Sequence, residues 1–261
     1  MNKDLRAHTI RFLEAGTRYD GRKPLEYREI SVEYGTVKNA EGSCRVKIGD
    51  TEVITGVKLV VDKPYPDTPD KGSLMVGAEF LPIANPDFET GPPGIAAVEL
   101  ARVVDRGIRE SGAIDVHKLC ITAGEKAWTV IIDICTVNDS GNLLDASALS
   151  AIAALQNAKF PEYTNGQIHY GKLTDVPLPL RDLPIEVTVF KIGKSYLVDP
   201  TIDEEKIYDA RLTVAISRGG KICALQKGGD GPLFEQDIIS MVEIAMEKQN
   251  ELREKLEGEH E

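Results

Sequence analysis

Three arginines at helical spacing are the first residues in this sequence whose types and positions could bind a ligand. They lie in residues 98–111, VELARVVDRGIRES, directly after the glycine- and proline-rich segment 91–94, which is typical of a chain about to begin a helix. At about 100° per residue, Arg102, Arg106 and Arg109 fall within a sector of roughly 60°. Guanidinium groups in such a row suit bidentate contact with phosphate oxygens. The pattern therefore predicts a helix face that binds phosphate groups.

The same stretch also carries acidic residues that favour a second interpretation. Glu99, Asp105 and Glu110 flank the arginines at helical spacings, so the face could be a ladder of surface salt bridges. Charged helix faces are usually solvated, and from the helix alone the solvated face is the favoured interpretation. The opposite side is apolar and is predicted to enter the core; it carries Ala97, Leu100, Val104 and Ile108.

The charge of the whole chain limits what these arginines can do alone. The 261 residues include 31 Lys and Arg against 42 Asp and Glu, a formal net charge of −11. Non-specific binding to nucleic acid depends on neutralising phosphates with basic side chains, so an acidic chain is a poor general binder. Contact with RNA or DNA would need a local basic patch, or a surface completed by another chain.

Other residue types that commonly build sites form no pattern. The cysteines are far apart and are expected to be reduced, mostly buried thiols; they are Cys44, Cys120, Cys135 and Cys223. The histidines are scattered, so we predict no metal site and no cofactor; they are His8, His117, His169 and His260. The first residues contain no apolar run, and no stretch approaches the length of a membrane span. We therefore expect a cytoplasmic protein that does not contact a membrane.

Hydrophobic periodicity and turn residues predict an α+β protein. Strands are expected at 30–34, 43–48, 52–57, 73–81, 119–122, 127–137, 185–190, 196–198, 211–217 and 222–226. Helices are expected at 5–14, 98–111, 143–158 and 232–256, the last with Ile238, Val242, Ala245, Met246 and Leu252 on one face. Residues 62–72 and 171–184 are predicted proline-rich connections, the first long enough to suggest a function. Strands followed by a helix occur twice, which predicts a single domain, 1–261, of two similar halves, roughly 1–160 and 161–261.

Carboxylates gather in a second candidate segment, residues 196–215, YLVDPTIDEEKIYDARLTVA. Acidic side chains that follow a strand can hold a divalent cation. They can equally form a polar turn between two strands, and the residues alone favour that interpretation.

Several segments in the same order resemble the RNase PH-type proteins, and specifically the non-catalytic RNase PH-like subunits of the archaeal exosome. The matching segments are 18–22, RYDGR; 91–94, GPPG, leading into 99–106, ELARVVDR; and 199–205, DPTIDEE. The resemblance covers nearly the whole chain. It implies an RNase PH-like fold and a role in the 3′-to-5′ phosphorolytic degradation of RNA.

Active members of that family need two features that this chain lacks. One is a Gly-Thr-Arg-like loop at a helix N-terminus, which cradles the attacking phosphate; here residues 142–144, NLL, stand in its place and Leu144 replaces the guanidinium. The other is a pair of aspartates that assist the leaving group or hold a metal. Glu205 replaces the first aspartate, and Arg211 replaces the second with the opposite charge. We expect Arg211 to form an internal salt bridge beside Glu205, and we expect this chain to have no catalytic residues of its own.

The resemblance therefore implies a non-catalytic subunit in a hetero-hexameric ring, which alternates with an active paralogue and carries RNA-binding cap subunits. In such a ring, Arg102, Arg106 and Arg109 would hold phosphates near the 3′ end of the RNA. Arg109 could instead pair with Asp105.

Two other functions are compatible with the sequence. One is a self-sufficient phosphorolytic exoribonuclease or nucleotidyltransferase, whose oxyanion site would use Arg18, Arg22 or Lys23. The other is a soluble protein with no role in RNA metabolism.

Overall fold

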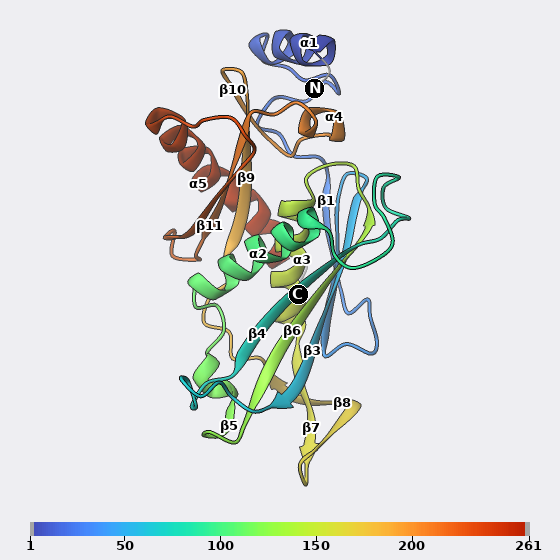
Figure 1. The fold of residues 1–261 in the computed structure, drawn as a ribbon, viewed down its shortest axis with the longest axis vertical. Coiled ribbons are helices and arrows are strands. Elements are labelled where there is room, and N and C mark those ends of the chain that lie inside the picture. Colours follow the sequence, from blue (N-terminus) through green and yellow to red (C-terminus); the bar gives the residue numbers. More distant parts are fainter. Residues whose placement is uncertain (1–2, 259–261) are drawn as a thin grey trace.

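The computed structural model describes residues 3–258 and is an α+β structure in which two helices lie between two sheets (Figure 1). The helices are α1 (Lys3–Glu14), α2 (Ile95–Glu110), α3 (Leu143–Asn157), α4 (Ile202–Glu205) and α5 (Glu235–Gly258), with a short 3-10 helix at Val116–Leu119. The predicted α+β class and the long C-terminal helix are confirmed.

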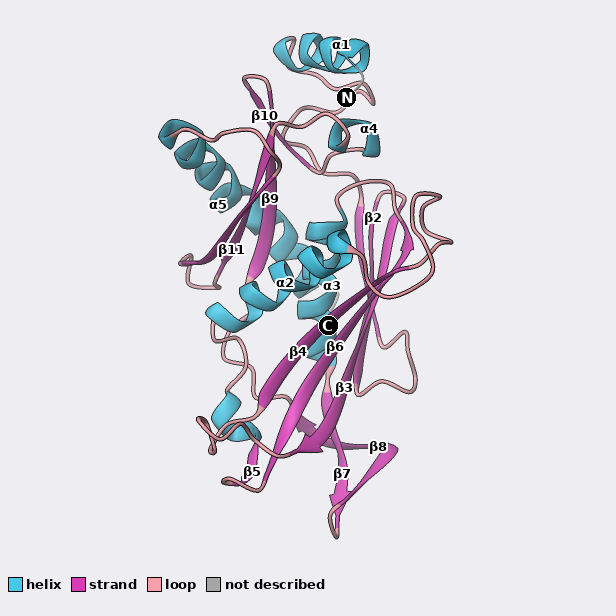
Figure 2. Cartoon of the chain, in the orientation of Figure 1, coloured by secondary structure: helices cyan, strands magenta, loops and turns pink. Residues whose placement is uncertain are grey.

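The larger sheet has six strands, with β1-β2-β3-β6-β4 as its order and β5 paired to β6 (Figure 2). Its strands are β1 (Ile30–Tyr34), β2 (Gly42–Ile48), β3 (Thr51–Asp62), β4 (Ser73–Phe80), β5 (Cys120–Thr122) and β6 (Lys126–Asn138). The first three form the predicted antiparallel meander, and burial alternates along β3 as its sequence predicts. β4 runs parallel to β6 and is the edge strand at that end of the sheet.

The smaller sheet has four antiparallel strands in the order β10-β9-β11-β12. Its strands are β9 (Ile185–Ile192), β10 (Ser195–Val198), β11 (Ala210–Ile216) and β12 (Ile222–Gly228). Every residue of β11 is buried, so both faces of the sheet are covered at this strand. The reason is that α2 contacts β11 and β12, while α5 packs on β9 and β11.

Helix α3 forms the centre of the core because its sequence has almost no large polar side chain. It contacts β2 and β3 of the larger sheet, β9 of the smaller sheet, and α2. Its residues from Asp145 to Leu155 are all buried, as the Ala-rich stretch predicts. Small side chains let the helix approach strands on two sides, so α3 holds the two sheets together.

Two sequence predictions of local structure were wrong. Residues 171–184, predicted as a connection, contain the end of β8 (Gln167–Pro177), which pairs with β7 (Lys159–Thr164) in a separate hairpin. The predicted buried face of the C-terminal helix included Ile238, which is 39% exposed. That helix begins at Glu235 and buries Asp237, Met241, Ala245, Gln249, Leu252 and Leu256.

The cysteines are all free thiols, but only Cys44 is buried and the other three are half-buried, so the prediction of mostly buried thiols was wrong. Within residues 3–258, no helix has the length and apolar character needed to cross a membrane. His260 lies outside the described residues.

The contact between β2 and α3 predicts that Gly42→Ala destabilises the protein. A Cβ at Gly42 would lie 2.6 Å from the Cα of Ala158 and even closer to the carbonyl oxygen of Ala154. The end of α3 would have to move, so we expect the free energy of unfolding to fall by about 1–3 kcal/mol, measured by urea denaturation. Gly56→Ala on the adjacent strand is the matched control, because its Cβ would meet only the Cβ of Ala40, at 3.7 Å. Equal losses in the two variants would contradict this account.

Candidate functional site

The three arginines predicted to bind phosphate lie on the exposed side of α2. Arg102, Arg106 and Arg109 all face solvent. The opposite side of the helix is buried and consists of Ala97, Leu100, Ala101, Val103, Val104, Gly107 and Ile108. Gly107 lets the helix lie against β9, because an added Cβ would overlap the carboxylate of Glu186. The apolar side of α2 therefore fixes the direction in which the arginines point.

The arginines differ in their partners within the chain. Arg109 donates from Nε and Nη2 to the two carboxylate oxygens of Asp105, at 3.0 and 2.6 Å, and these hydrogen bonds raise the pKa of its guanidinium. Arg106 donates to the neutral side chain of Gln226 at 2.7 Å. The side chain of Arg102 makes no hydrogen bond or ion pair with any residue between 3 and 258. Arg102 and Arg106 are thus the more available cations, while Arg109 forms the pair with Asp105 that the sequence left as an alternative.

Arg211 forms an internal salt bridge as predicted, but the predicted partner, Glu205, was wrong. Its Nη2 donates to Glu99 Oε1 at 2.6 Å. Arg211 lies on β11, next to α2, and its side chain is only 7% exposed. Arg211 acts on Glu205 through its charge: burial raises the pKa of the Glu205 carboxyl, and the cation of Arg211 opposes that rise. Arg211 therefore fastens the smaller sheet to the arginine-bearing helix.

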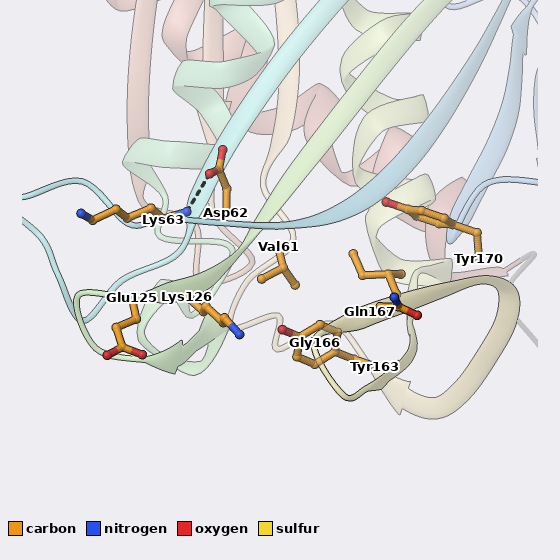
Figure 3. A pocket seen from close by; sticks show the side chains of 10 residues that line it. Val61, Asp62, Lys63, Glu125, Lys126, Tyr163, Gly166, Gln167 and Tyr170 are labelled. Atoms are coloured by element: carbon orange, nitrogen blue, oxygen red, sulfur yellow. Dashed lines mark hydrogen bonds between the residues drawn. The ribbon is translucent and has the colours of Figure 1, made fainter.

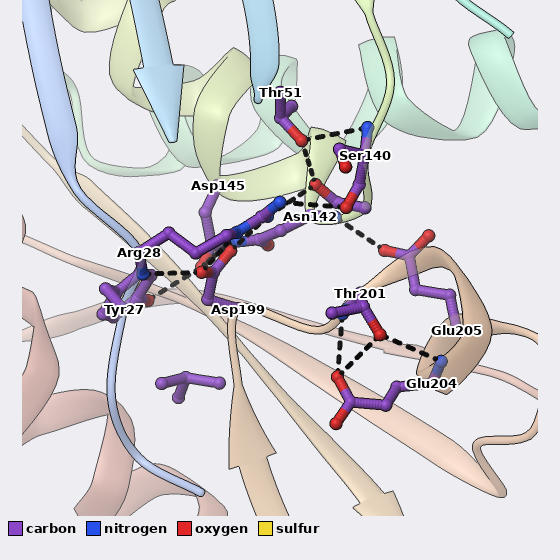
Figure 4. A network of polar contacts seen from close by, with 12 residues as sticks. Tyr27, Arg28, Thr51, Ser140, Asn142, Asp145, Asp199, Thr201, Glu204 and Glu205 are labelled. Carbon is purple, nitrogen blue, oxygen red and sulfur yellow. Dashed lines mark hydrogen bonds and ion pairs between the residues drawn. The ribbon is translucent and has the colours of Figure 1, made fainter. Parts of the chain in front are cut away.

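The N-terminus of α3 is occupied by a carboxylate of the protein itself. Asn142 has a left-handed backbone conformation (φ 62°) just before the helix, and its side chain does not cap the helix. Glu205 Oε1 accepts a hydrogen bond from the backbone N–H of Asn142 at 2.8 Å (Figure 4). Helix N-termini attract anions, because their N–H groups lack partners and the helix dipole is positive there. Glu205 therefore lies where an external anion would bind.

Leu144 lies in the first turn of α3, the position predicted to replace the guanidinium. It is half-buried and packs against the hydrophobic core. An apolar side chain there supplies neither charge nor a hydrogen bond to an anion. The first turn of α3 thus contains none of the cationic groups that phosphate binding favours.

Burial raises the pKa of Glu205 to about 7. The hydrogen bond from Asn142 and the cations Arg211 and Arg28 oppose this shift, while Asp139 adds to it. A large fraction of Glu205 is therefore protonated at neutral pH.

Asp199 connects the N-terminal loop to the start of α3 and is completely buried. Its carboxylate accepts hydrogen bonds from Arg28 Nε and Nη2 at 2.8 and 2.6 Å and from Asn142 Nδ2 at 3.0 Å (Figure 4). It also accepts one from Arg22 Nη1 at 2.7 Å. Arg28 also donates to the carbonyl of Ser140 at 2.9 Å. These contacts hold the turn before α3 in place.

Arg18, which is 2% exposed, completes this buried network. Its Nε donates to Glu204 Oε1 at 2.9 Å, and its Nη atoms donate to the carbonyls of Val198 and Asp199 at 3.0 and 2.7 Å. Glu204 also accepts the backbone N–H of Thr201, within the capping box that begins α4. The segments 18–22 and 199–205, which carried the family resemblance, therefore hold each other in place.

This network bears on two sites suggested by the sequence, an oxyanion site at residues 18–23 and a cation site among the carboxylates of residues 196–215. Arg18 and Arg22 are occupied by internal ion pairs, which leaves only Lys23 exposed among the three bases suggested for an oxyanion site. The carboxylates of Asp199, Glu204 and Glu205 all have protein partners, as a polar turn requires. Within residues 3–258, no group of three or more His, Cys, Asp or Glu side chains is arranged to hold a metal ion.

Sequence reasoning missed Arg28 and the buried Asp145, and it named Asn142 without predicting its contact with Asp199. Asp145 accepts hydrogen bonds from the hydroxyl of Tyr27 and the backbone N–H of Thr188, each at 2.8 Å, and burial raises its pKa to about 7. An Asn directly before an apolar helix was the one local signal for Asn142. The partners of Arg28 and Asp145 come from distant segments, which no sequence spacing indicates.

A separate polar cavity of about 560 Å³ lies between β3, β6 and the β7–β8 hairpin (Figure 3). It is lined by Val61, Asp62, Lys63, Glu125, Lys126, Tyr163, Gly166, Gln167, Ile168 and Tyr170. Its two lysines are balanced by two carboxylates, and it contains no nucleophile beside a base. This cavity therefore gives no indication of a catalytic function.

Comparison with known proteins gives the class to which this fold and site belong. The sequence model of the "3′ exoribonuclease family, domain 1" (RNase PH) matches residues 26–161, and that of domain 2 of the same family matches residues 182–248. The chain belongs to the RNase PH family of 3′ exoribonucleases.

Individual relatives show which members of the family the chain is similar to. The exosome complex component Rrp42 of Methanocella arvoryzae is 51% identical over 243 residues, covering 93% of this chain and 92% of the relative. Rrp42 of Thermococcus kodakarensis is 44% identical over 255 residues, covering 97% and 94%.

Solved structures show the same relationship. A chain of the Archaeoglobus fulgidus exosome with RNA bound to the active site superposes with a TM-score of 0.90 at 44% identity, covering 97% of this chain and 98% of that one. A chain of an archaeal exosome core gives a TM-score of 0.86 at 42% identity, covering 97% and 96%. Rice Rrp46, at 19% identity and a TM-score of 0.70, shares the fold.

The raised pKa of Glu205 predicts a pH-dependent gain in stability from Glu205→Gln. In wild-type protein the carboxyl is protonated more in the folded state, with a pKa of about 7, than in the unfolded state, whose ordinary value is 4.5. Its contribution to stability therefore falls as the pH rises from about 4.5 to about 7, and is constant above that. Glutamine keeps the acceptor for Asn142 without a charge, so the melting temperature of the variant should exceed that of wild type at pH 8 and approach it at pH 4.5.

Asp203→Asn is the matched control, because Asp203 lies on the same helix and is exposed. This control should show no comparable pH-dependent gain. A melting-temperature difference for Glu205→Gln that stays constant between pH 4.5 and 8 would show that Glu205 does not titrate as described.

Proposed function

We propose that this chain is a non-catalytic, RNA-binding subunit of an archaeal-type exosome, a complex that degrades RNA from its 3′ end by phosphorolysis. The proposal is supported by relatives named exosome complex component Rrp42 at up to 51% identity, and by the similar solved chain from an exosome with RNA at its active site. In this proposal the chain alternates with a paralogous catalytic subunit in a hetero-hexameric ring, beneath RNA-binding cap subunits, in the cytoplasm.

One observation carries the non-catalytic part of the proposal: Glu205 accepts the backbone N–H of Asn142 at the N-terminus of α3. Phosphorolysis needs inorganic phosphate held close to the terminal phosphodiester, and a helix N-terminus with a nearby guanidinium suits that task. Here the first turn carries Leu144, and the carboxyl group of Glu205 accepts the backbone N–H of Asn142. An anion brought to this place would have to displace the Glu205 carboxyl group, and it would find no cationic side chain in the first turn of α3.

The RNA-binding part of the proposal rests on the exposed arginines of α2. A chain with a net charge of −11 cannot attract RNA over its whole surface. Arg102 and Arg106, however, present guanidinium groups one turn apart on one side of a rigid helix. They would contact phosphates of the RNA backbone, while the paralogue binds inorganic phosphate and catalyses its attack on the 3′-terminal phosphodiester. Such contacts are tolerant of base sequence and sensitive to salt.

The self-sufficient enzyme is the weaker alternative. Its oxyanion site would need bases that the buried network already uses, since Arg18 pairs with Glu204 and Arg22 with Asp199. A protein without any RNA role would give the exposed arginines of α2 no ligand to bind and would leave them as an ordinary solvated helix face.

The first expected outcome concerns the purified chain alone. Incubated with oligoadenylate and inorganic phosphate, it should release no nucleoside diphosphate, because no site holds the attacking phosphate. Mixing it with the paralogous subunit should give a complex that does release nucleoside diphosphate, measured by chromatography of the products. Release by the isolated chain would overturn the non-catalytic assignment.

A second experiment tests the arginine face in the reconstituted complex. Arg102→Ala with Arg106→Ala removes two phosphate contacts, so the slope of log K against log salt concentration for single-stranded RNA should become shallower by about 1.4. Affinity at fixed low salt should fall about tenfold, measured by fluorescence anisotropy. Arg109→Ala should have a smaller effect, because Arg109 is already paired with Asp105.

The matched control is Arg11→Ala with Lys23→Ala, which changes the net charge equally at two exposed bases away from α2. It should leave the slope unchanged. Equal losses in the two double variants would reduce the arginine effect to net charge and contradict a specific contact.

A further inference from the structure

We propose that Arg211 is a positioning residue for RNA binding: it holds the Glu99 carboxylate and so keeps Arg102 free to contact RNA phosphate. The inference rests on the proposed function and adds to it the device by which the arginine face stays cationic. Its starting point is the one salt bridge between β11 and α2 described above, from Arg211 Nη2 to Glu99 Oε1.

Glu99 lies on the same side of α2 as the arginines. At about 100° per residue, positions 99 and 102 are about 60° apart around the helix. Residues three apart on a helix have Cβ atoms about 5–6 Å from each other, close enough for an ion pair. Left without another partner, Glu99 would therefore be within reach of the Arg102 guanidinium.

The same face shows what an unheld carboxylate does. Among the described residues, Asp105 has no ion pair with a cation from another element, and it binds Arg109, four residues later, through both carboxylate oxygens. Arg109 consequently has less capacity for a phosphate. Glu99 differs from Asp105 in having a cation from β11, and Arg102 differs from Arg109 in having no partner within residues 3–258.

Arg211 is suited to hold Glu99 because it cannot easily move. Its side chain is 7% exposed, and it lies against the backbone of Gly228 on β12, where an added Cβ would be 2.6 Å from its Cζ. Its Nη1 also donates to the hydroxyl of Thr213 at 3.4 Å. A buried, fixed guanidinium loses little side-chain entropy on pairing, whereas Arg102 on the surface would lose more. Glu99 is therefore held by Arg211 in preference to Arg102.

The replacement of an acidic residue by Arg211 thus has a consequence for substrate binding. A carboxylate at this position would repel Glu99 and leave it to pair with Arg102. With arginine at position 211, the charge of Glu99 is neutralised by a side chain of β11, and Arg102 remains exposed and unpaired within residues 3–258.

The test uses the reconstituted complex and salt titrations of single-stranded RNA binding. Arg211→Gln should release Glu99, weaken RNA binding about threefold, and make the slope of log K against log salt concentration shallower by about 0.7, the value for one phosphate on a single strand. Adding Glu99→Gln to that variant should restore both affinity and slope, because no carboxylate is left to bind Arg102. Arg218→Gln, which removes an exposed base at the β11–β12 turn, is the control and should change neither.

Three results would overturn the proposal: an unchanged slope in Arg211→Gln, a double variant that remains as weak as the single one, or tighter binding by Arg211→Gln. A purely structural role of the pair predicts the second result, because Glu99→Gln cannot restore a lost contact. If Arg211→Gln does not assemble into the complex, Glu99→Gln alone decides. The proposal requires that variant to bind RNA at least as tightly as wild type, and weaker binding would contradict it.

Arg102→Ala separates this inference from the proposed function. If Arg102→Ala does not weaken RNA binding, the arginine face is not the RNA contact and the proposed function fails in that part. If Arg102→Ala weakens binding while Arg211→Gln does not, the RNA contact stands and only the positioning role of Arg211 is wrong.

Discussion

The arrangement of residues around the N-terminus of α3 depends on one buried carboxylate, that of Asp199, which joins three segments far apart in the sequence. It binds Arg22 and Arg28 from the N-terminal loop and Asn142 from the turn before α3. A charge taken out of water must be fully paired, and losing one partner of a buried pair costs about 3–5 kcal/mol. All three segments are therefore held in one arrangement. That arrangement places α4 where Glu205 reaches the N–H group of Asn142.

The fold could be predicted where burial follows a simple period along one segment. Alternation in β1, β2 and β3 gave the meander, and the Ala-rich stretch with almost no charge gave a helix buried nearly all round, α3. The β7–β8 hairpin was missed because Pro161 and Pro177 lie within it and many of its side chains are exposed. Proline is tolerated in such edge strands, where no neighbouring strand needs its missing N–H group. Its composition therefore resembled that of a loop.

Contacts within the site divide in the same way. The common direction of Arg102, Arg106 and Arg109 follows from helical spacing, as does the pairing of Arg109 with Asp105 four residues away. The partner of Arg211 could not be found this way, since Glu99 lies 112 residues earlier in the chain. Proximity in sequence to Glu205 suggested the wrong partner. Only the packing of α2 against β11 decides which carboxylate a buried guanidinium meets.

In the proposed non-catalytic role, Glu205 and Arg211 make contacts that oppose a phosphate-binding catalytic site. Glu205 accepts the N–H group at the start of α3, so phosphate would first have to displace a covalently tethered carboxylate, whose effective concentration is high. Arg211 compensates Glu99, so an acidic residue at 211 would lie opposite another carboxylate in a half-buried place. Each reversal alone therefore creates an unfavourable charge before it restores any catalytic group. Glu205 ends α4 and Arg211 lies near the start of β11, so a phosphate site here would need changes at both residues and at their partners on α3 and α2. The contact from Arg211 to Glu99 also fastens β11 to α2, the helix that carries Arg102.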